Sequence, residues 1–500
     1  MKKLLTLILL VLPLLCFSDS TSTRPPVTIV IFGSTGDLTA RKLYPAIYNL
    51  ALEEKELNEN FSLVGVGRRN LSAEELHDSV YASLDKFSRL KPSDKSWNLF
   101  KQHLVYHKAD FSLESDYLGL KELLAQQDQK AGRPGNTIFY LATDSSYFPT
   151  IIHNLYKHGL VDQNGGSKFS RVIIEKPFGE DLDSAIELQA FISQFLDEEQ
   201  IFRMDHYLGK EGMLTLMKFR FQDAKFESLF DQKYVSNIQM TLSETIGIST
   251  RANFYEKTGH LRDVVQNHAM QLLAIATMEP PLGLKAEEIL KEKAKVLYAI
   301  RPYSSEEIAQ YVIRGQYSSG IIEGKPVIGY RDENGVPKTS QIETFVQAKM
   351  FIDNERWSGV PIYIKSGKRL PQQTTQVTFN LKDNPFQIDA ITIAIQPKSQ
   401  ILITRGEITE AYEIQASPCF AGREAYENLI LATVQGDQSH FVTMDEVLST
   451  WSLLTPVLKH WSTTPENVLL YEAGQWGPEA AEQQLQQDGF EWKVLNSKNK

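Results

Sequence analysis

Near its N-terminus the sequence passes from a short apolar run to a glycine turn and then to a helical pattern. The β-branched run Val27–Phe32 is long enough for a strand that is buried on both faces. Beyond the turn, Leu43, Ile47 and Leu50 recur on one face of a helix. Glycines in such a turn let the backbone approach a pyrophosphate at the helix N-terminus, although a G-x-x-G spacing also occurs in plain tight connections. This order predicts a dinucleotide-binding Rossmann domain whose cofactor-binding turn is Gly33, Ser34, Thr35, Gly36, Asp37 and Leu38.

A second apolar run, Phe61–Gly67, is followed by Arg68 and Arg69. An NAD site places a carboxylate there for the ribose hydroxyls, whereas a guanidinium suits a 2′-phosphate. The residues therefore predict NADP as the cofactor, with Arg68 as a contact; the alternative is that both arginines only face solvent.

Two further runs, Thr137–Ala142 and Arg171–Glu175, are expected as the third and fourth strands of this domain. Lys176 follows the fourth run at the carboxyl end, where ligands bind in such sheets, and from there it could reach both cofactor and substrate. We expect Pro177 to hold this loop rigid, through a cis bond if the turn requires one.

The segment Asp205–Glu211 (D-H-Y-L-G-K-E) concentrates groups with anion and proton chemistry around one glycine. His206, Tyr207 and Lys210 offer three kinds of donor to a phosphate. Asp205 would repel a phosphate, so it is expected to orient and charge a histidine base instead. A solvated polar turn is the plain alternative, and only the rest of the sequence decides against it.

Four segments together resemble the glucose-6-phosphate dehydrogenase family, from about Val27 to the C-terminal end. They are Gly33–Leu38, Glu175–Gly179, Arg203–Glu211 and Arg262–His268, and the combination of D-H-Y-L-G-K-E with Q-N-H is the specific part. The resemblance implies that His268 is the base that takes the C1 hydroxyl proton of glucose 6-phosphate, paired with Asp205, while C1 gives hydride to NADP. It implies phosphate contacts from His206, Tyr207 and Lys210, and further substrate contacts from Lys176, Glu244, Asp263 and Lys368. No metal is needed, and no Cys/His cluster with ligand spacing is present.

Two positions depart from the family pattern. Some relatives carry a lysine where this chain has Gln373, and relatives usually have one or two prolines where it has Asp144-Ser145-Ser146. The glutamine puts the affinity for the sugar phosphate in doubt. The Asp-Ser-Ser loop puts the contacts near the nicotinamide half of the cofactor in doubt.

Two other functions remain as alternatives. A Rossmann enzyme of the glucose–fructose oxidoreductase kind also carries an E-K-P segment, but it lacks the Asp205–Glu211 and Gln266–His268 pair. A non-catalytic NADP-sensing relative would have no use for a base and its carboxylate. The net charge of −10 argues against nucleic acid as a partner.

Residues 1–23 resemble a secretory leader, with Lys2-Lys3 before a twelve-residue apolar run. Three interpretations are open: a true signal, which would fit a hexose-6-phosphate dehydrogenase of a secretory lumen; an uncleaved extension; or a start assigned too far upstream. Cys16 and Cys419 are the two cysteines, so removal of the leader would leave one thiol, as is typical of a reduced compartment. We expect a cytoplasmic protein.

We place the domain boundary at Met204: residues 24–204 form the NADP-binding domain and residues 205–500 the substrate and dimerisation domain. Strand-like runs predict a large, mostly antiparallel α+β domain, which the resemblance also implies, together with a homodimer or a dimer of dimers. These runs are Val235–Glu244, Glu343–Ile352, Val360–Lys365, Gln376–Asn380, Ala390–Gln396 and Glu407–Ile414.

Overall fold

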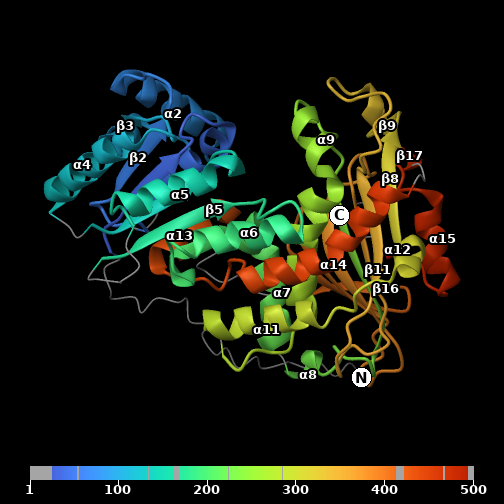
Figure 1. The fold of residues 1–500 in the computed structure, drawn as a ribbon. Coiled ribbons are helices and arrows are strands. Elements are labelled where there is room, and N and C mark those ends of the chain that lie inside the picture. The colour runs from blue at the N-terminus through green and yellow to red at the C-terminus, as the bar shows by residue number, and fades with distance from the viewer. Residues whose placement is uncertain are drawn as a thin grey trace.

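The computed structural model describes residues 25–52, 56–132, 135–161, 168–222, 224–283, 285–412, 422–464 and 468–493. Two lobes lie side by side in Figure 1, each built on its own sheet. The leader-like segment, Cys16, Cys419 and the residues from Asn496 onward lie outside the described residues.

The first lobe contains a parallel six-stranded sheet in the order β3-β2-β1-β4-β5-β6. This order, with helices between the strands, is that of a dinucleotide-binding doubly wound fold, so the predicted Rossmann domain is confirmed. Its strands are β1 (Thr28–Phe32), β2 (Ser62–Gly67), β3 (Leu104–Lys108), β4 (Thr137–Leu141), β5 (Ser170–Glu175) and β6 (Ile201–Met204).

Two strands of this sheet were missed by the sequence pattern, and the runs expected as third and fourth strands are β4 and β5. β3 is an edge strand whose residues after Leu104 are only partly buried, so it lacks a continuous apolar run. β6 has four residues and includes Arg203, which is buried because it pairs with Glu198 at 2.5 Å. Lys176 therefore follows the fifth strand, still at the carboxyl edge of the sheet.

The second lobe contains a nine-stranded sheet in the order β16-β15-β14-β13-β7-β12-β11-β8-β17. Only β7 with β12 and β17 with β8 pair in parallel, so the predicted mostly antiparallel α+β domain is confirmed. Its strands are β7 (Val235–Ser243), β8 (Val312–Ser318), β11 (Phe345–Met350), β12 (Ile362–Gly367), β13 (Thr374–Leu381), β14 (Ala390–Gln396), β15 (Gln400–Arg405), β16 (Ile408–Tyr412) and β17 (Leu469–Glu472), and a separate ribbon pairs β9 (Gly320–Ile322) with β10 (Lys325–Val327).

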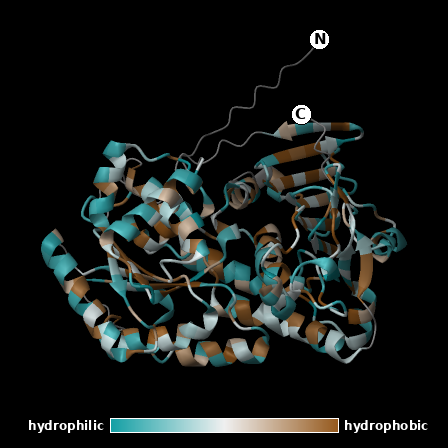
Figure 2. Cartoon of the chain, turned by 90° about the horizontal axis from the view of Figure 1, so that it is seen from above, coloured by the Kyte–Doolittle hydropathy of each residue, from teal (hydrophilic) through white to brown (hydrophobic). Residues whose placement is uncertain are grey.

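Hydrophobic and hydrophilic residues alternate along the helices and strands of both lobes in Figure 2. This alternation places apolar side chains between helix and sheet, where their burial stabilises the fold. The α-helices are α1 (Tyr44–Leu52), α2 (Ala73–Phe87), α3 (Asp94–Phe100), α4 (Glu114–Ala131), α5 (Phe148–Lys157), α6 (Leu182–Ile192), α7 (Glu211–Gln222), α8 (Ala224–Glu227), α9 (Ala252–His260), α10 (Met270–Thr277), α11 (Ala286–Tyr298), α12 (Ser305–Tyr311), α13 (Ala425–Gln435), α14 (Met444–Thr463) and α15 (Glu479–Gln487). Within the described part of the chain, every helix is too short or too polar to cross a membrane.

Helix α13 returns from the second lobe to pack against the first, beside α1. Its Glu427 is buried between Asn49 and Arg89 of the first lobe, at 2.9 Å and 2.5 Å. Arg171, on β5, donates to the carbonyls of Thr433 and Val434 near the end of α13. The two lobes therefore share buried contacts along α13.

A π-helical segment, η6 (Leu261–Ala269), carries His268. Gly259, at φ 68°, precedes it, and a side chain there would collide with the carboxylate of Glu343. That carboxylate accepts from the backbone of Leu261 at 2.9 Å. A π-helix has more residues per turn than an α-helix, so the Asp263 and His268 side chains are separated by about 50° around the helix axis instead of about 140°. Both side chains therefore face the same site.

Candidate active site

The glycine turn after β1 is held tightly against its neighbours. The backbone N–H groups of Gly33 and Ser34 both donate to the carbonyl of Val66, at 3.0 and 3.1 Å. Gly33 has φ 92°, and a Cβ there would collide with the carbonyl oxygen of Ala142, at the end of β4. The turn thus leaves backbone groups accessible at the carboxyl edge of the sheet, as a pyrophosphate-binding turn requires.

Arg68 is exposed directly after β2, and Gly67 before it lies against Ser34 of the turn. Asp37 is also exposed and pairs with Arg41 at 3.8 Å. Arg68 is thus placed where a 2′-phosphate would lie in a Rossmann site. Among the described residues, no hydrogen bond joins Arg68 to the residues around His268.

Lys176 points from the end of β5 to the π-helical segment. Its Nζ donates to Oδ1 of Asp263 at 2.9 Å and to the Asp263 carbonyl at 2.5 Å. The peptide bond from Lys176 to Pro177 is cis. Burial would raise the pKa of Asp263, but Lys176 and Lys368 hold that pKa well below its usual range. Asp263 therefore stays charged, and its ion pair with Lys176 joins the first lobe to the second.

Asp205 and His268 form a buried hydrogen-bonded pair. Nδ1 of His268 lies 2.5 Å from Oδ1 of Asp205, which also accepts from the backbone N–H of Tyr207 at 2.9 Å. Asp205 is 1% exposed and His268 4%. Since Nδ1 donates to the carboxylate, Nε2 is the ring nitrogen left to accept a proton.

The pKa values of this pair are shifted in the direction that a buried base requires. Burial alone would raise the pKa of Asp205, but the charge of His268 and its hydrogen bond hold it well below the usual range. Burial lowers the pKa of His268, and Asp205 opposes that shift while Lys176 and Lys210 add to it. His268 is therefore neutral at pH 7, with Asp205 ready to stabilise the imidazolium.

His206, Tyr207 and Lys210 surround the imidazole of His268. The ring of Tyr207 stacks on His268 with centroids 4.1 Å apart, and the ring of His206 meets it edge-on at 4.6 Å. Lys210 lies over the Tyr207 ring and donates to Gln396 Oε1 at 2.5 Å. Burial lowers the pKa of Lys210 to about 8. These donors can converge on a phosphate beside the base.

Glu244, which follows β7, accepts from Nζ of Lys368 at 2.7 Å. Lys368 is 1% exposed. Burial would raise the pKa of Glu244, but Lys368 lowers it. The structure thus brings every predicted catalytic and substrate residue into one electrostatic cluster.

Four residues at this site were given no role from the sequence, although Glu175 lies in the Glu175–Gly179 motif. Tyr140 donates to Glu175 at 2.5 Å, and burial raises the pKa of Glu175 to about 7. Tyr426, on α13, stacks parallel to His206 with centroids 6.0 Å apart. Gln396 contacts Lys210 and Tyr207 from β14. Of the four, only Glu175 belongs to a motif named in the sequence analysis, because it directly precedes Lys176.

The two departures from the family pattern have clear positions. Gln373 is exposed just before β13. Asp144 accepts from the backbone N–H of Ser146 at 3.0 Å and from its hydroxyl at 2.6 Å, and these bonds lower its pKa. Asp144 therefore acts locally as a helix cap after β4.

Asp205, His206 and His268 are the group of three in the described chain whose possible ligand atoms all lie within 4.8 Å of one another. Asp205 and His268 are joined directly by a hydrogen bond between Oδ1 and Nδ1. We interpret this geometry as that of proton transfer.

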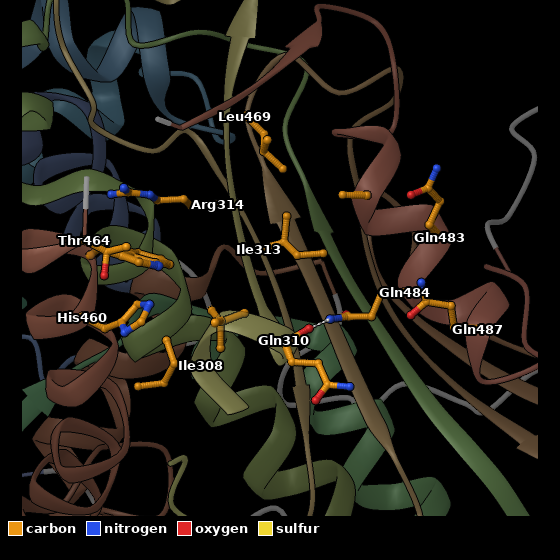
Figure 3. Close-up of a pocket in the computed structure, with 14 residues that line it drawn as sticks. Ile308, Gln310, Ile313, Arg314, His460, Thr464, Leu469, Gln483, Gln484 and Gln487 are labelled. Carbon is orange, nitrogen blue, oxygen red and sulfur yellow. Dashed lines mark hydrogen bonds between the residues drawn. The ribbon is translucent and has the colours of Figure 1, made fainter. Parts of the chain in front are cut away.

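A cavity of about 300 Å³ lies elsewhere in the second lobe, between α12, α14 and α15 (Figure 3). Its lining is mainly apolar and amide, including Ile308, Ile313, Gln483 and Gln487. It contains none of the predicted site residues, so it is distinct from the cluster around His268.

Known proteins that are similar to this chain share one family name. Residues 30–214 match the model for the glucose-6-phosphate dehydrogenase NAD binding domain, and residues 217–493 match that for the glucose-6-phosphate dehydrogenase C-terminal domain. The chain is 40% identical to glucose-6-phosphate 1-dehydrogenase of Chlamydia pneumoniae (95% of this chain, 98% of the relative) and 40% identical to that of Bacillus subtilis strain 168 (94% and 99%). A solved structure of glucose-6-phosphate dehydrogenase in complex with its substrate glucose 6-phosphate is similar with a TM-score of 0.84 at 30% identity (95% of this chain, 100% of that chain).

Proposed function

The chain belongs to the glucose-6-phosphate dehydrogenase family, and we propose that its buried Asp205–His268 pair carries out that family's reaction. The reaction oxidises D-glucose 6-phosphate to 6-phospho-D-glucono-1,5-lactone with hydride transfer to NADP⁺, the first step of the oxidative pentose phosphate pathway. The observation that carries this assignment is the 2.5 Å contact between Nδ1 of His268 and Oδ1 of Asp205, because it leaves Nε2 to accept the C1 hydroxyl proton.

His206, Tyr207 and Lys210 hold the 6-phosphate in this proposal. They offer a ring N–H, a phenol and an ammonium next to His268, so a bound phosphate would fix the sugar against the base. Lys210 is the cationic member, and a phosphate dianion would favour its charged form.

Asp263 and Glu244 accept hydrogen bonds from sugar hydroxyls. Each carboxylate has lone pairs beyond those used by Lys176 and Lys368. The two lysines keep these carboxylates charged, so that they remain acceptors inside a buried site.

The cofactor edge fits NADP. Gly33 brings the turn so close to Ala142 that a side chain is excluded there, and Arg68 stands exposed after β2. Residues Gly33–Leu38 would hold the pyrophosphate, Arg68 the 2′-phosphate, and Lys176 the nicotinamide end. Bound NADP⁺ supplies the hydride acceptor.

The test is NADPH formation by the purified full-length protein with glucose 6-phosphate, compared with free glucose and with NAD. We expect turnover that requires the phosphate and prefers NADP. A folded protein that binds NADP without turnover would instead support the NADP-sensing alternative.

We further propose that the protein is cytoplasmic and forms a homodimer through the second lobe. The low cysteine number supports the first point. For the second, β16 lies at the edge of the nine-stranded sheet and exposes Ile408, which a second copy could cover. Light scattering after size exclusion should give twice the chain mass, and a strictly monomeric mass would contradict the dimer.

A further inference from the structure

A small cavity lies beside Asp205, between the helix that carries His268 and α14. Over about 10 Å³ it has room for the centre of a water molecule. Its polar lining comes from the carboxylate of Asp205, from three amide residues of the helix that carries His268, and from a hydroxyl of α14: Asp205, Gln266, Asn267, Gln271 and Thr450.

Two oxygen atoms at this cavity accept no hydrogen bond from any described residue. One is Oδ2 of Asp205, the oxygen that does not face His268, and the other is Oε1 of Gln271. Both side chains are buried, at 1% and 2% exposure. A buried carboxylate oxygen and a buried amide oxygen without donors are costly, so a donor to both would stabilise the site.

The orientation of Gln271 is fixed from its other end. Its Nε2 donates to Oε2 of Glu446 at 2.9 Å, so Oε1 is turned away from Glu446. The same Glu446 oxygen lies 3.0 Å from Nζ of Lys293, and both side chains of that ion pair are fully buried. Its other oxygen accepts from Thr443 in the capping box that starts α14. Both oxygens of the Glu446 carboxylate therefore have donors, which fixes its orientation.

We propose that one water molecule donates to both Oδ2 of Asp205 and Oε1 of Gln271, and that Gln271 is a positioning residue for the reaction. Water fits because it supplies two O–H donors from one small molecule, whereas both flanking groups are acceptors only. The Lys293–Glu446 pair orients Gln271, Gln271 orients the water, and the water fixes the plane of the Asp205 carboxylate toward His268.

Gln271 is the amide residue of the cavity whose side-chain oxygen has no donor among the described residues. Gln266 donates to Thr450 at 3.0 Å, and Asn267 donates to the carbonyl of Arg262 at 2.7 Å. Thr450 in turn donates to the carbonyl of Val447. Their hydrogen bonds stabilise helix packing, so we expect their replacement to affect stability first.

The inference rests on the proposed function, and two measurements test it separately from that function. The first is a crystal structure of the wild-type protein at a resolution that shows ordered water. We expect density for one water within hydrogen-bonding distance of Asp205 Oδ2 and Gln271 Oε1. A direct hydrogen bond from the Gln271 amide to Asp205, or a dry cavity, would overturn the proposal whether or not the enzyme is active.

The second measurement compares Gln271→Leu with wild type and with Gln347→Leu. Gln347 is a matched control: it is fully buried, donates through Nε2, and lies on β11 away from the catalytic pair. Both variants should lose stability. Only Gln271→Leu should lower kcat, by about tenfold with KM for glucose 6-phosphate within about twofold, and move the acid limb of the pH profile to lower pH.

The direction of that pH shift follows from the role assigned to Asp205. A carboxylate that is poorly oriented raises the pKa of His268 less, so the imidazole becomes a weaker base that stays neutral to lower pH. If wild type is active and Gln271→Leu retains its kcat and pH profile, the positioning role is wrong. If wild type itself is inactive, the proposed function fails instead.

Discussion

Nδ1 of His268 lies 2.5 Å from Oδ1 of Asp205, although the two residues stand on different elements, 63 positions apart in the chain. Asp205 follows the last strand of the first sheet, and His268 lies near the end of a π-helical segment of the second lobe. The site exists only where the lobes meet, so the chemistry depends on how the lobes are packed.

Asp205→Asn should keep much of the local geometry, because Tyr207 can still donate to the side-chain oxygen. The charge that supports the imidazolium is lost, however. We expect kcat to fall by about 10²–10⁴, with binding of glucose 6-phosphate little changed. Steady-state kinetics and a titration of bound sugar phosphate check this, and unchanged kcat would remove Asp205 from proton transfer.

The acid limb of kcat/KM should lie below the usual histidine pKa of about 6.5. Burial, with help from Lys176 and Lys210, lowers the pKa of His268 in the free enzyme despite Asp205. A base must be neutral, so activity should persist below pH 6.5 and disappear as His268 becomes protonated at lower pH. An acid limb above pH 7 would contradict this assignment.

The basic limb should report Lys210. Burial lowers its pKa to about 8, so the free enzyme loses this phosphate-binding charge as the pH rises through that value. KM for glucose 6-phosphate should then increase, and Lys210→Arg should move the limb to higher pH because arginine stays protonated. Lys218→Arg, on α7, is the control; the same shift in that variant would contradict the role of Lys210.

Arg68→Ala should raise KM for NADP much more than KM for NAD. The guanidinium is exposed beside the glycine turn, where it can contact a 2′-phosphate that only NADP carries. Arg301→Ala provides an exposed arginine at a distant position as the control. Equal effects of Arg68→Ala on both cofactors would contradict the 2′-phosphate assignment.

The sequence predicted the parts of the fold that have strong local signals. β1, β2 and the glycine turn follow from a continuous apolar run and two glycines, and β14 was predicted with its observed bounds, Ala390–Gln396. β3 and β6 were missed because an edge strand and a strand containing a paired arginine show no apolar run. The π-helical segment was missed because its contacts are tertiary: Leu261, at its start, donates to Glu343, which lies far along the chain.

The roles of the site residues came from the motifs, whereas the residues that support them depend on tertiary packing. Tyr426 reaches His206 only because α13 returns to the first lobe, and Gln271 reaches the cavity beside Asp205 only through its bond to Glu446. No periodicity marks such contacts, since they join segments more than 150 residues apart.

The most direct test of the account is to compare NADPH formation by wild type and His268→Asn, with glucose 6-phosphate and NADP at saturation. We expect wild type to turn over only when both are present, and His268→Asn to lose about 10²–10⁴ in kcat while still binding the sugar phosphate. Near-normal kcat in His268→Asn would contradict the central claim, because another group would then have to take the proton.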